Sequence, residues 1–102
     1  MPDFPAPEMA DVELVDIMKA LSDPTRLEIV ADLADGEPHP KQGYPAKYDC
    51  SKSTMSHHFR TLREAGLTRT VVEGRTHTVQ LRREELDRKF PGLIDAITRS
   101  RS

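Results

Sequence analysis

Apolar residues near the start of the chain recur at the spacing of one helix face. Leu14, Ile17, Met18 and Leu21 stand at positions i, i+3, i+4 and i+7, which places them on one side of an α-helix. The pattern predicts a helix that begins near Asp11. Three prolines precede it within residues 2–8, so we expect residues 1–10 to form a flexible tail.

A second helix is predicted to begin at the pair Asp23-Pro24. Asp is a favoured N-cap residue, and Pro is favoured at the first helical position. Gly36 is expected to end this helix in a left-handed conformation. Its buried side is formed by Leu27, Val30, Ala31, Leu33 and Ala34. Residues 37–49 hold three prolines and a glycine, so we expect a loop there with at most a short helical turn.

Residues 51–65 carry the strongest helical pattern of the chain. With about 100° between successive residues, Met55, Phe59, Leu62 and Gly66 fall on one side of this helix. The opposite side is polar and consists of Ser53, His57, Arg60, Thr61 and Glu64. The helix is therefore expected to bury one face, to expose the other and to end at Gly66.

The segments 68–73 and 75–81 are rich in Val and Thr and are separated at Glu73-Gly74-Arg75. This pattern predicts a β-hairpin with Gly74 in its turn and with Val79 and Leu81 on its inner face. A helical pattern returns at Leu86 and Phe90, is broken at Pro91-Gly92, and continues through Leu93, Ile94 and Ile97.

The order of these elements is that of a winged helix-turn-helix: helix, helix, weak segment, helix, hairpin, helix. The fold class is accordingly mainly α with a β-hairpin, and we expect a single domain over residues 11–98. A domain of this size buries only about two thirds of the surface of its unfolded chain. Pairing of two copies is therefore a reasonable expectation.

Charge changes this picture because it is unevenly distributed, although the net charge is only −2. Acids predominate over residues 1–37, where only Lys19 and Arg26 oppose them. Bases predominate over residues 38–83, where only Asp49, Glu64 and Glu73 are acidic. The basic half is expected either to bind a polyanion or to form an ordinary solvated surface.

A polar helix face by itself is usually just solvated surface, but a helix followed by a glycine turn and a basic hairpin favours DNA. Hydroxyl groups at a helix N-terminus can bind phosphate, and arginine pairs well with guanine in the major groove. A basic hairpin tip can lie on the adjacent backbone or minor groove. The candidate contacts with double-stranded DNA are Ser51, Lys52, Ser53, Thr54, Ser56, His57, Arg60, Arg63, Arg69 and Arg75.

Two runs of sequence resemble the ArsR-type winged-helix repressors. The run KALSDPTRL over residues 19–27 is similar to the stretch that joins the first two helices of that family. The run STMSHHFRTLREAGL over residues 53–67 is similar to its recognition helix. The resemblance covers roughly residues 12–97. It implies a homodimeric repressor that an effector releases from its operator.

By the same resemblance, the first and last helices join the two protomers. The apolar residues that such an interface needs are Leu14, Ile17, Met18, Leu21, Leu93, Ile94 and Ile97. The family also keeps a histidine at the position of His58, which borders the buried side of its helix. We favour packing and a hydrogen bond for His58 over a base contact, and we favour His57 as the residue that faces DNA.

Metal sensing is common in this family, through cysteines near the helix before the recognition helix or through Asp/His and His/Glu pairs on the last helix. Residues 37–49 offer His39 but no cysteine, and residues 83–100 contain no histidine. Neither metal site carries over, so we expect no metal and no cofactor. A nickel or zinc effector held by the weak candidates His39, Cys50 or His77 stays open as an alternative.

Cys50 is the single cysteine and cannot form an internal disulfide. A thiol near a helix N-terminus can be reactive, but an ordinary half-buried cysteine is the favoured interpretation. A hydrolase built on Cys50 is disfavoured, because three short helices and a hairpin leave little room for a cleft. We therefore expect no enzymatic activity.

The beginning of the chain lacks the basic and apolar segments of a secretory signal, and no apolar run approaches the ~20 residues that span a bilayer. A cytoplasmic protein is expected. The alternative function is a winged helix that binds another protein and has no operator of its own. A related alternative is a regulator that works with a separate sensor protein.

Overall fold

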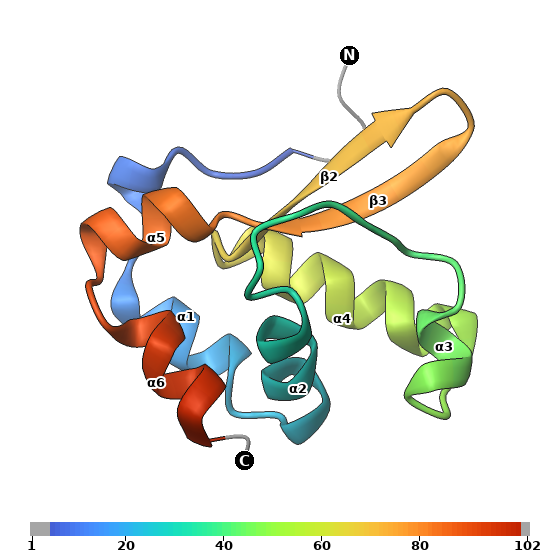
Figure 1. Ribbon diagram of the computed structural model, residues 1–102, viewed down its shortest axis with the longest axis horizontal. Coiled ribbons are helices and arrows are strands. Elements are labelled where there is room, and N and C mark those ends of the chain that lie inside the picture. Colours follow the sequence, from blue (N-terminus) through green and yellow to red (C-terminus); the bar gives the residue numbers. More distant parts are fainter. Residues whose placement is uncertain (1–4, 101–102) are drawn as a thin grey trace.

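The longest described helix, Lys52–Glu64, lies beneath the base of a β-hairpin at the centre of the molecule (Figure 1). The computed structural model describes residues 5–100. In chain order its elements are the 3₁₀ turn η1 (Met9–Asp11), α1 (Leu14–Ala20), α2 (Pro24–Asp32), β1 (His39–Pro40), α3 (Tyr44–Lys47), α4 (Lys52–Glu64), β2 (Thr68–Glu73), β3 (Thr76–Leu81), α5 (Arg83–Lys89) and α6 (Leu93–Ser100).

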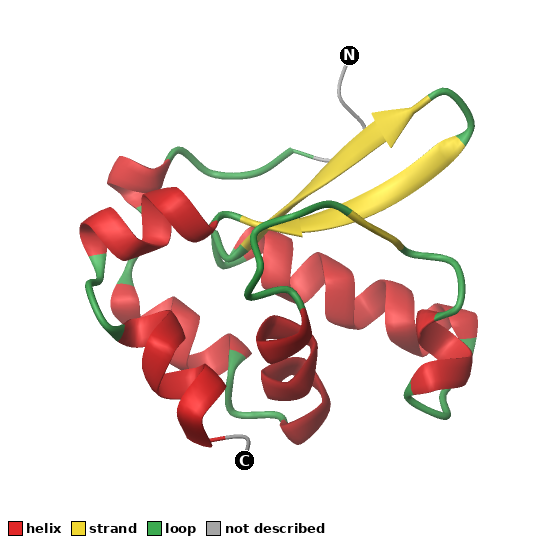
Figure 2. Cartoon of the chain, in the orientation of Figure 1, coloured by secondary structure: helices red, strands yellow, loops and turns green. Residues whose placement is uncertain are grey.

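The helices and the sheet divide the molecule into two ends (Figures 1 and 2). Helices α1, α5 and α6 gather at one end, whereas α3 and the tip of the hairpin lie at the other. Helix α4 runs between these ends. None of the helices within residues 5–100 is both long and apolar enough to cross a membrane.

The first helix begins later than its apolar pattern predicts. Asp11 belongs to η1, and α1 starts at Leu14. Val12 between them is extended, with φ −77° and ψ 127°. This conformation inserts the Val12 side chain into the core beside Gly66. The physical reason for the later start is that burial of Val12 outweighs one further turn of helix.

The second helix begins as predicted. Asp23 caps it by accepting a hydrogen bond from the backbone N–H of Arg26 at 3.0 Å, and Pro24 occupies the first turn. Gly36 has φ +75°, and its N–H donates to the carbonyl of Leu33. The glycine thus satisfies a carbonyl at the end of the helix.

The expectation of a plain loop over residues 37–49 is incomplete. The segment contains the short helix α3, as expected, but also the strand β1, which the sequence pattern does not predict. His39 pairs with Val79 and Pro40 with Thr78, so the sheet order is β1-β3-β2. β1 is an edge strand, where the missing N–H of a proline costs no ladder hydrogen bond.

The hairpin matches its predicted form. Thr68 pairs with Leu81 at its base and Glu73 with Thr76 at its tip, which leaves a two-residue turn at Gly74-Arg75. Gly74 has φ +62° at the first turn position, as the type II′ hairpin turn requires.

Both ends of the chain pack on one core. The buried side of α4 consists of Met55, Phe59 and Leu62, as its pattern predicts. Side chains without any exposed area come from α1, α2, α4, α5 and α6 and from the residues that follow α2 and α4: Ile17, Ile29, Val30, Leu33, Leu62, Leu67, Leu86 and Ile94. The last helical pattern is divided into α5 and α6 at Pro91-Gly92, as expected.

The N-terminal segment differs from the flexible tail expected over residues 1–10, of which residues 1–4 lie outside the described part. Residues 5–12 lie along the body of the protein and are bound through backbone carbonyls. Arg82 Nη1 donates to the carbonyl of Pro7 at 2.7 Å. Lys89 Nζ lies within 3.1 Å of the carbonyl oxygens of Met9, Ala10 and Val12.

Candidate nucleic-acid interface

Hydroxyl groups cluster at the start of α4. Ser51 is the N-cap, and its Oγ accepts a hydrogen bond from the backbone N–H of Thr54 at 3.1 Å. The same Oγ lies 2.9 Å from Thr54 Oγ1 and 3.2 Å from Ser53 Oγ. The extended backbone of Ser51 and the helical backbone after it thus bring three hydroxyls to one exposed helix end.

The candidate DNA contacts on α4 lie on its exposed side. This side carries two cationic groups, three hydroxyls and an imidazole, all exposed: Lys52, Ser53, Thr54, Ser56, His57 and Arg60. Arg63 is half-buried near the C-terminal end of the helix, where its Nε donates to the carbonyl of Pro5 at 3.3 Å. The exposed set can donate hydrogen bonds both to phosphates and to base edges.

Helix α3 is held against α2 and α4 by its two tyrosines. The buried ring of Tyr44 stacks on Tyr48 with a centroid distance of 5.9 Å and meets Phe59 edge-on at 5.5 Å. Tyr48 donates a hydrogen bond to Asp32 Oδ2, and the same oxygen forms an ion pair with Lys47 Nζ at 2.8 Å. Burial, with a smaller contribution from Asp32, raises the pKa of Tyr44 to about 12. These contacts fix α3 and α4 as a rigid pair.

His58 has the structural role favoured for it. Its Nδ1 lies 3.2 Å from Nη1 of Arg26, whose Nε donates to the carbonyl of Ala20 at 2.6 Å. Burial is the main cause that lowers the pKa of His58 below its ordinary value. The Asp23-Pro24-Thr25-Arg26 turn is thereby joined to α4, whereas the neighbouring His57 is exposed.

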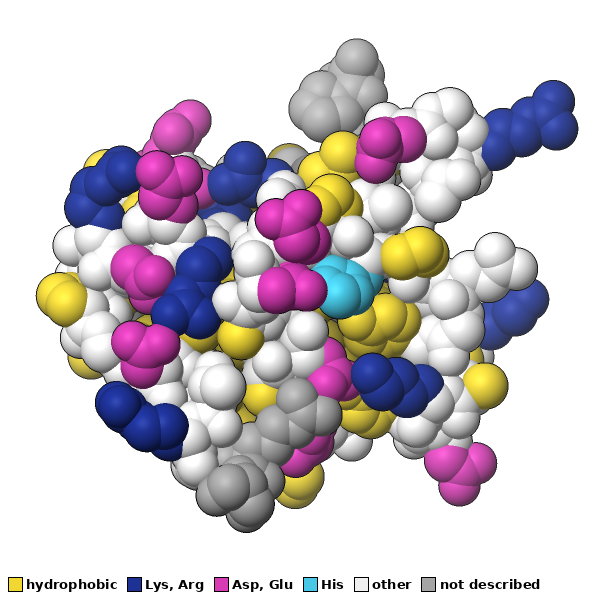
Figure 3. Space-filling model, viewed as in Figure 1, with side chains coloured by type: hydrophobic (Ala, Val, Ile, Leu, Met, Phe, Trp, Pro, Cys, Tyr) yellow, Lys and Arg dark blue, Asp and Glu magenta, His cyan; other side chains and the backbone are white. Residues whose placement is uncertain are grey.

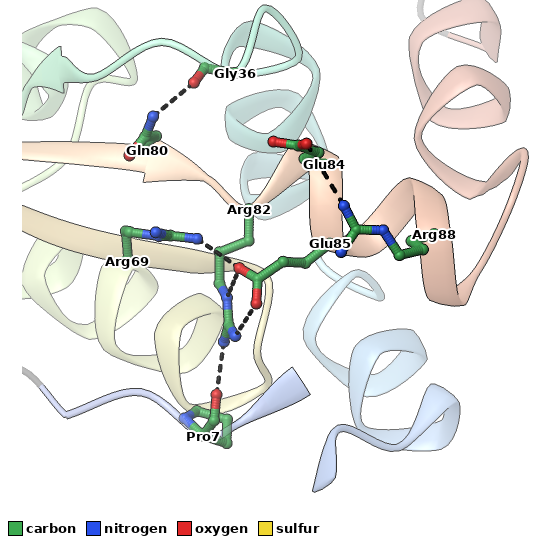
Figure 4. Close-up of polar contacts among 8 residues, drawn as sticks. All are labelled: Pro7, Gly36, Arg69, Gln80, Arg82, Glu84, Glu85 and Arg88. Atoms are coloured by element: carbon green, nitrogen blue, oxygen red, sulfur yellow. Dashed lines mark hydrogen bonds and ion pairs between the residues drawn. The ribbon is translucent and has the colours of Figure 1, made fainter. Parts of the chain in front are cut away.

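The two arginines predicted for the hairpin are placed differently. Arg75 is exposed in the turn, and Figure 3 shows a basic side chain that extends beyond the end of the hairpin. Arg69 lies at the hairpin base, where Nη2 forms an ion pair with Glu85 Oε1 at 2.5 Å (Figure 4). Arg69 would have to leave Glu85 to contact DNA, so the geometry favours Arg75.

Glu85 joins Arg69 of the hairpin to Arg82, the arginine that binds the carbonyl of Pro7. It accepts hydrogen bonds from Nε and Nη2 of Arg82 at 3.0 and 3.1 Å (Figure 4). Arg82 is only 6% exposed, and its hydrogen bonds are the main cause of the lowered pKa of Glu85. This network fixes the angle of the hairpin relative to α5.

Known proteins share both the sequence and the geometry. A helix-turn-helix domain model matches residues 21–71. The uncharacterized HTH-type transcriptional regulator YceK of Bacillus subtilis is 40% identical over 82 residues, which cover 79% of this chain and 82% of that protein. The arsenical resistance operon repressor of Staphylococcus xylosus is 39% identical over 79 residues, 78% of this chain and 75% of the repressor.

Among solved structures, HlyU of Vibrio cholerae matches with a TM-score of 0.71 and 25% identity, over 85% of this chain and 89% of HlyU. The chain belongs to the ArsR-type winged helix-turn-helix regulators. It is therefore a DNA-binding transcriptional regulator, with α3 and α4 as its helix-turn-helix and the β2–β3 hairpin as its wing.

In this ArsR-type regulator, the weak metal candidates do not form a cluster. Nε2 of His39 lies 3.0 Å from both carboxylate oxygens of Asp35. The N–H of Glu37 and then His39 lower the pKa of Asp35. Cys50 is half-buried and His77 is exposed. Residues 5–100 contain no group of three or more His, Cys, Asp or Glu placed to hold a metal ion.

The apolar residues expected at the dimer interface fall into two groups. Leu14 and Met18 are 46% and 45% exposed on α1. Ile17 and Ile94 have no exposed area, Ile97 is buried, and Leu21 and Leu93 are half-buried. The buried residues pack in the core of their own chain, because α1 and α6 each turn one face toward it.

Two residues near these surfaces were missed from the sequence. Val15 is 59% exposed on α1, and its spacing of three from Met18 could have included it in the stripe. Lys41 follows β1 and reaches Thr70 Oγ1 on β2 at 2.7 Å. No pattern in its proline-rich segment indicated that contact, since it depends on the unpredicted pairing of β1 with β3.

Proposed function

We propose that this ArsR-type regulator is a cytoplasmic repressor that binds an inverted-repeat operator as a homodimer. The observation that carries the proposal is the placement of two different surfaces. The start of α4 and the wing tip lie toward one end of the molecule, whereas α1, which carries exposed apolar residues, lies toward the other. Two copies joined through α1 would present two copies of α4 to successive turns of DNA.

The exposed residues indicate which part of the DNA each of them would contact. His57 and Arg60 stand one turn apart on α4 and are proposed to contact base edges in the major groove. The hydroxyls of Ser51, Ser53 and Thr54 bind backbone phosphate at the helix start. Arg75 contacts the DNA backbone that lies beside the wing. No catalytic activity, cofactor or resident metal is part of this function.

Release from the operator is proposed to depend on an effector or on a partner protein that carries the sensor. A partner suits a chain in which neither family metal site can be carried over. A nickel or zinc effector bound through His39, Cys50 or His77 has no cluster among the described residues to support it. Adding zinc, nickel or a thiol oxidant to the bound complex tests each effector class directly.

The test begins with a labelled duplex that the wild-type protein enriches from a random-sequence library. Fluorescence anisotropy then compares the wild type with Arg60→Ala on this duplex and on a scrambled one. We expect the variant to lose about 1–3 kcal/mol on the selected duplex and little on the scrambled duplex.

Arg88→Ala is the matched control, because Arg88 is an exposed arginine on α5. We expect this variant to bind as the wild type does. Equal binding of the wild type to both duplexes, or to neither, would contradict a sequence-specific repressor. That result would favour a winged helix that binds another protein.

A further inference from the structure

A depression of about 390 Å³ lies where the loop after β1 passes the tip of the wing. The residues that line it are Pro40, Lys41, Gln42, Arg75, Thr76 and His77. None of these described residues is acidic, and two of them are cationic. The lining of the depression is therefore positively charged, as expected of a site for an anion.

A larger depression, of about 620 Å³, lies at the base of the wing and lacks this property. Its arginines are paired with carboxylates in the same depression. Arg69 and Arg82 bind Glu85, Arg83 binds Asp87, and Arg88 lies near Glu84. Acidic and basic side chains also alternate over α5 and α6 in Figure 3. An incoming anion would have to compete with these carboxylates.

Lys41 is fixed in the angle between the wing and α4. Its backbone N–H donates to the carbonyl of His77 at 3.0 Å, which continues the pairing of β1 with β3. Its side chain crosses the sheet, where Nζ donates to Thr70 Oγ1 at 2.7 Å. Nζ also lies 5.4 Å from the centroid of the Phe59 ring on α4. Lys41 thus contacts both elements that a winged helix presents to DNA.

The surroundings of Lys41 disfavour its charge. Burial, and then the positive charge of Arg63 on α4, lower the pKa of Lys41 to about 8. Arg69 and Glu73 alternate with Thr70 along β2, and therefore point to the other face of the sheet. Other titratable groups on the elements around Lys41 include Arg75 and His77 of the wing, His39 of β1, Tyr44 and Lys47 of α3, and His57, His58, Arg60 and Glu64 of α4. An anion close to Lys41 would restore the charged form.

We propose that this depression seats one backbone phosphate of the bound DNA, and that Lys41 contacts this phosphate together with Arg75. The inference rests on the proposed function, because it requires α4 and the wing to bind the same duplex. DNA presents phosphates along both strands. A strand that passes between α4 and the wing tip would cross the angle that Lys41 occupies.

This assignment links DNA binding to proton uptake. Above about pH 8 the free protein has lost the Lys41 proton, and it must regain the proton to hold the phosphate. The affinity of the wild type is therefore expected to fall about fourfold per protomer between pH 7 and pH 9, since the free Lys41 titrates near pH 8 and its charge contributes about eightfold to the affinity. Arginine at this position stays charged over the whole range.

The experiment measures binding to the library-selected duplex by anisotropy, with Lys41→Arg, Lys41→Met and wild type from pH 7 to pH 9. Lys41→Arg is expected to keep its affinity at pH 9. Lys41→Met is expected to bind about eightfold more weakly per protomer at pH 7 and about 0.1 M salt, with a salt slope smaller by about 0.9. Arg88→Ala, which removes an exposed arginine on α5, is expected to leave affinity, salt slope and pH dependence unchanged.

Calorimetry at pH 8.5 in two buffers of different ionisation enthalpy counts the protons directly. We expect uptake by the wild type and by Arg88→Ala, and none by Lys41→Arg. Wild-type binding with no uptake, or Lys41→Met binding as tightly as wild type at pH 7, would overturn the inference and leave the repressor proposal standing. Failure of the wild type to bind any duplex would overturn both.

Inorganic phosphate, compared with chloride at equal ionic strength, separates the backbone phosphate from a free anion. We expect the two salts to weaken DNA binding equally. Stronger competition by inorganic phosphate, removed in Lys41→Met, would assign the depression to a free anion and overturn its assignment to DNA.

Discussion

The hydrogen bond between Arg26 and His58 determines which nitrogen of the imidazole can carry a proton. Arginine only donates, so Nδ1 of His58 must accept, and the proton of the neutral ring is on Nε2. Protonation of Nδ1 would remove this acceptor and place two positive charges together. The link between the α1–α2 turn and α4 is therefore made only by neutral His58.

A pH dependence of stability follows from this arrangement. The folded-state pKa of His58 lies below its ordinary value of 6.5, so the unfolded chain binds the proton more readily. The contribution of His58 is complete above about pH 6.5 and is lost as the pH falls toward its folded-state pKa. Chemical denaturation at pH 7.5 and pH 5 should show a smaller loss of unfolding free energy in His58→Gln than in wild type.

His57→Gln is the matched control, since His57 is the exposed neighbour. Its loss of stability between the two pH values should equal that of the wild type. An unchanged loss in His58→Gln would contradict the proposed linkage. A titration of the ring protons by NMR provides a second measure of the His58 pKa.

At the scale of residues, the sequence predicted roles that depend on local spacing. The Ser51 cap of α4, its exposed polar side and the buried border position of His58 all follow from the helical period. The sequence did not predict that Arg69 pairs with Glu85 or that Ile17 is buried in the core of its own chain. These outcomes depend on which distant element packs beside the residue.

Among the elements, the end of α4 is the point where backbone conformation and packing coincide. Gly66 has φ +92°, and a Cβ added there would lie 2.3 Å from Val12 Cγ2. The helix end therefore requires glycine for two separate reasons: its left-handed backbone and its close approach to the extended segment before α1.

Gly66→Ala is expected to lower the free energy of unfolding by about 3–5 kcal/mol, from strain of the left-handed residue together with overpacking. Denaturant titration measures the loss. Gly74→Ala is the control, because Gly74 also has a positive φ but no atom within 4 Å of its added Cβ. It should lose only about 1–2 kcal/mol, and equal losses in the two variants would exclude the contact with Val12.

Helices with caps and a hairpin with a glycine turn were predictable because their signals lie within a few residues. Asp23-Pro24 and Gly74 each mark a boundary that the structure confirms, whereas α2 ends at Asp32, four residues before the predicted Gly36. β1 was missed because it is only His39–Pro40 and exists through its pairing with Val79 and Thr78. The late start of α1 likewise depends on Gly66, which is distant in sequence.

The whole molecule exposes a small apolar surface on α1. Leu14, Val15 and Met18 are all close to half exposed or more. In the proposed homodimer a second copy of the chain covers them. Burial of these side chains would then supply part of the free energy of association.

Met18→Glu is expected to shift the protein from dimer to monomer, because the interface would have to bury an unpaired carboxylate. Sedimentation velocity at micromolar concentration measures the shift, and DNA affinity should fall with it. Val72→Glu is the control, since Val72 is 51% exposed on the wing. A dimeric Met18→Glu protein, or a monomeric wild type, would contradict an interface on α1.

The arrangement of the whole chain was predictable from the order of its elements, which is that of a winged helix-turn-helix. The contacts that join α2 to the last two helices were not. Arg83 illustrates this, because its guanidinium binds the carbonyl of Ala34 at 3.0 Å and the carboxylates of Asp87 and Asp95. These contacts join the end of α2 to α5 and α6, and no local pattern specifies them.

The N-terminal segment is bound to Arg82 and Lys89 through the oxygens of its main chain. Every residue type supplies such an oxygen, so these contacts place little constraint on the side chains of residues 5–10, apart from Met9, which packs against the core. Over evolutionary time this segment is free to drift while its path over the protein persists. In diverging descendants of this gene, Arg82 and Lys89 should change more slowly than the residues that they bind. The N-terminal segment would then vary strongly in sequence while its position on the protein stays the same.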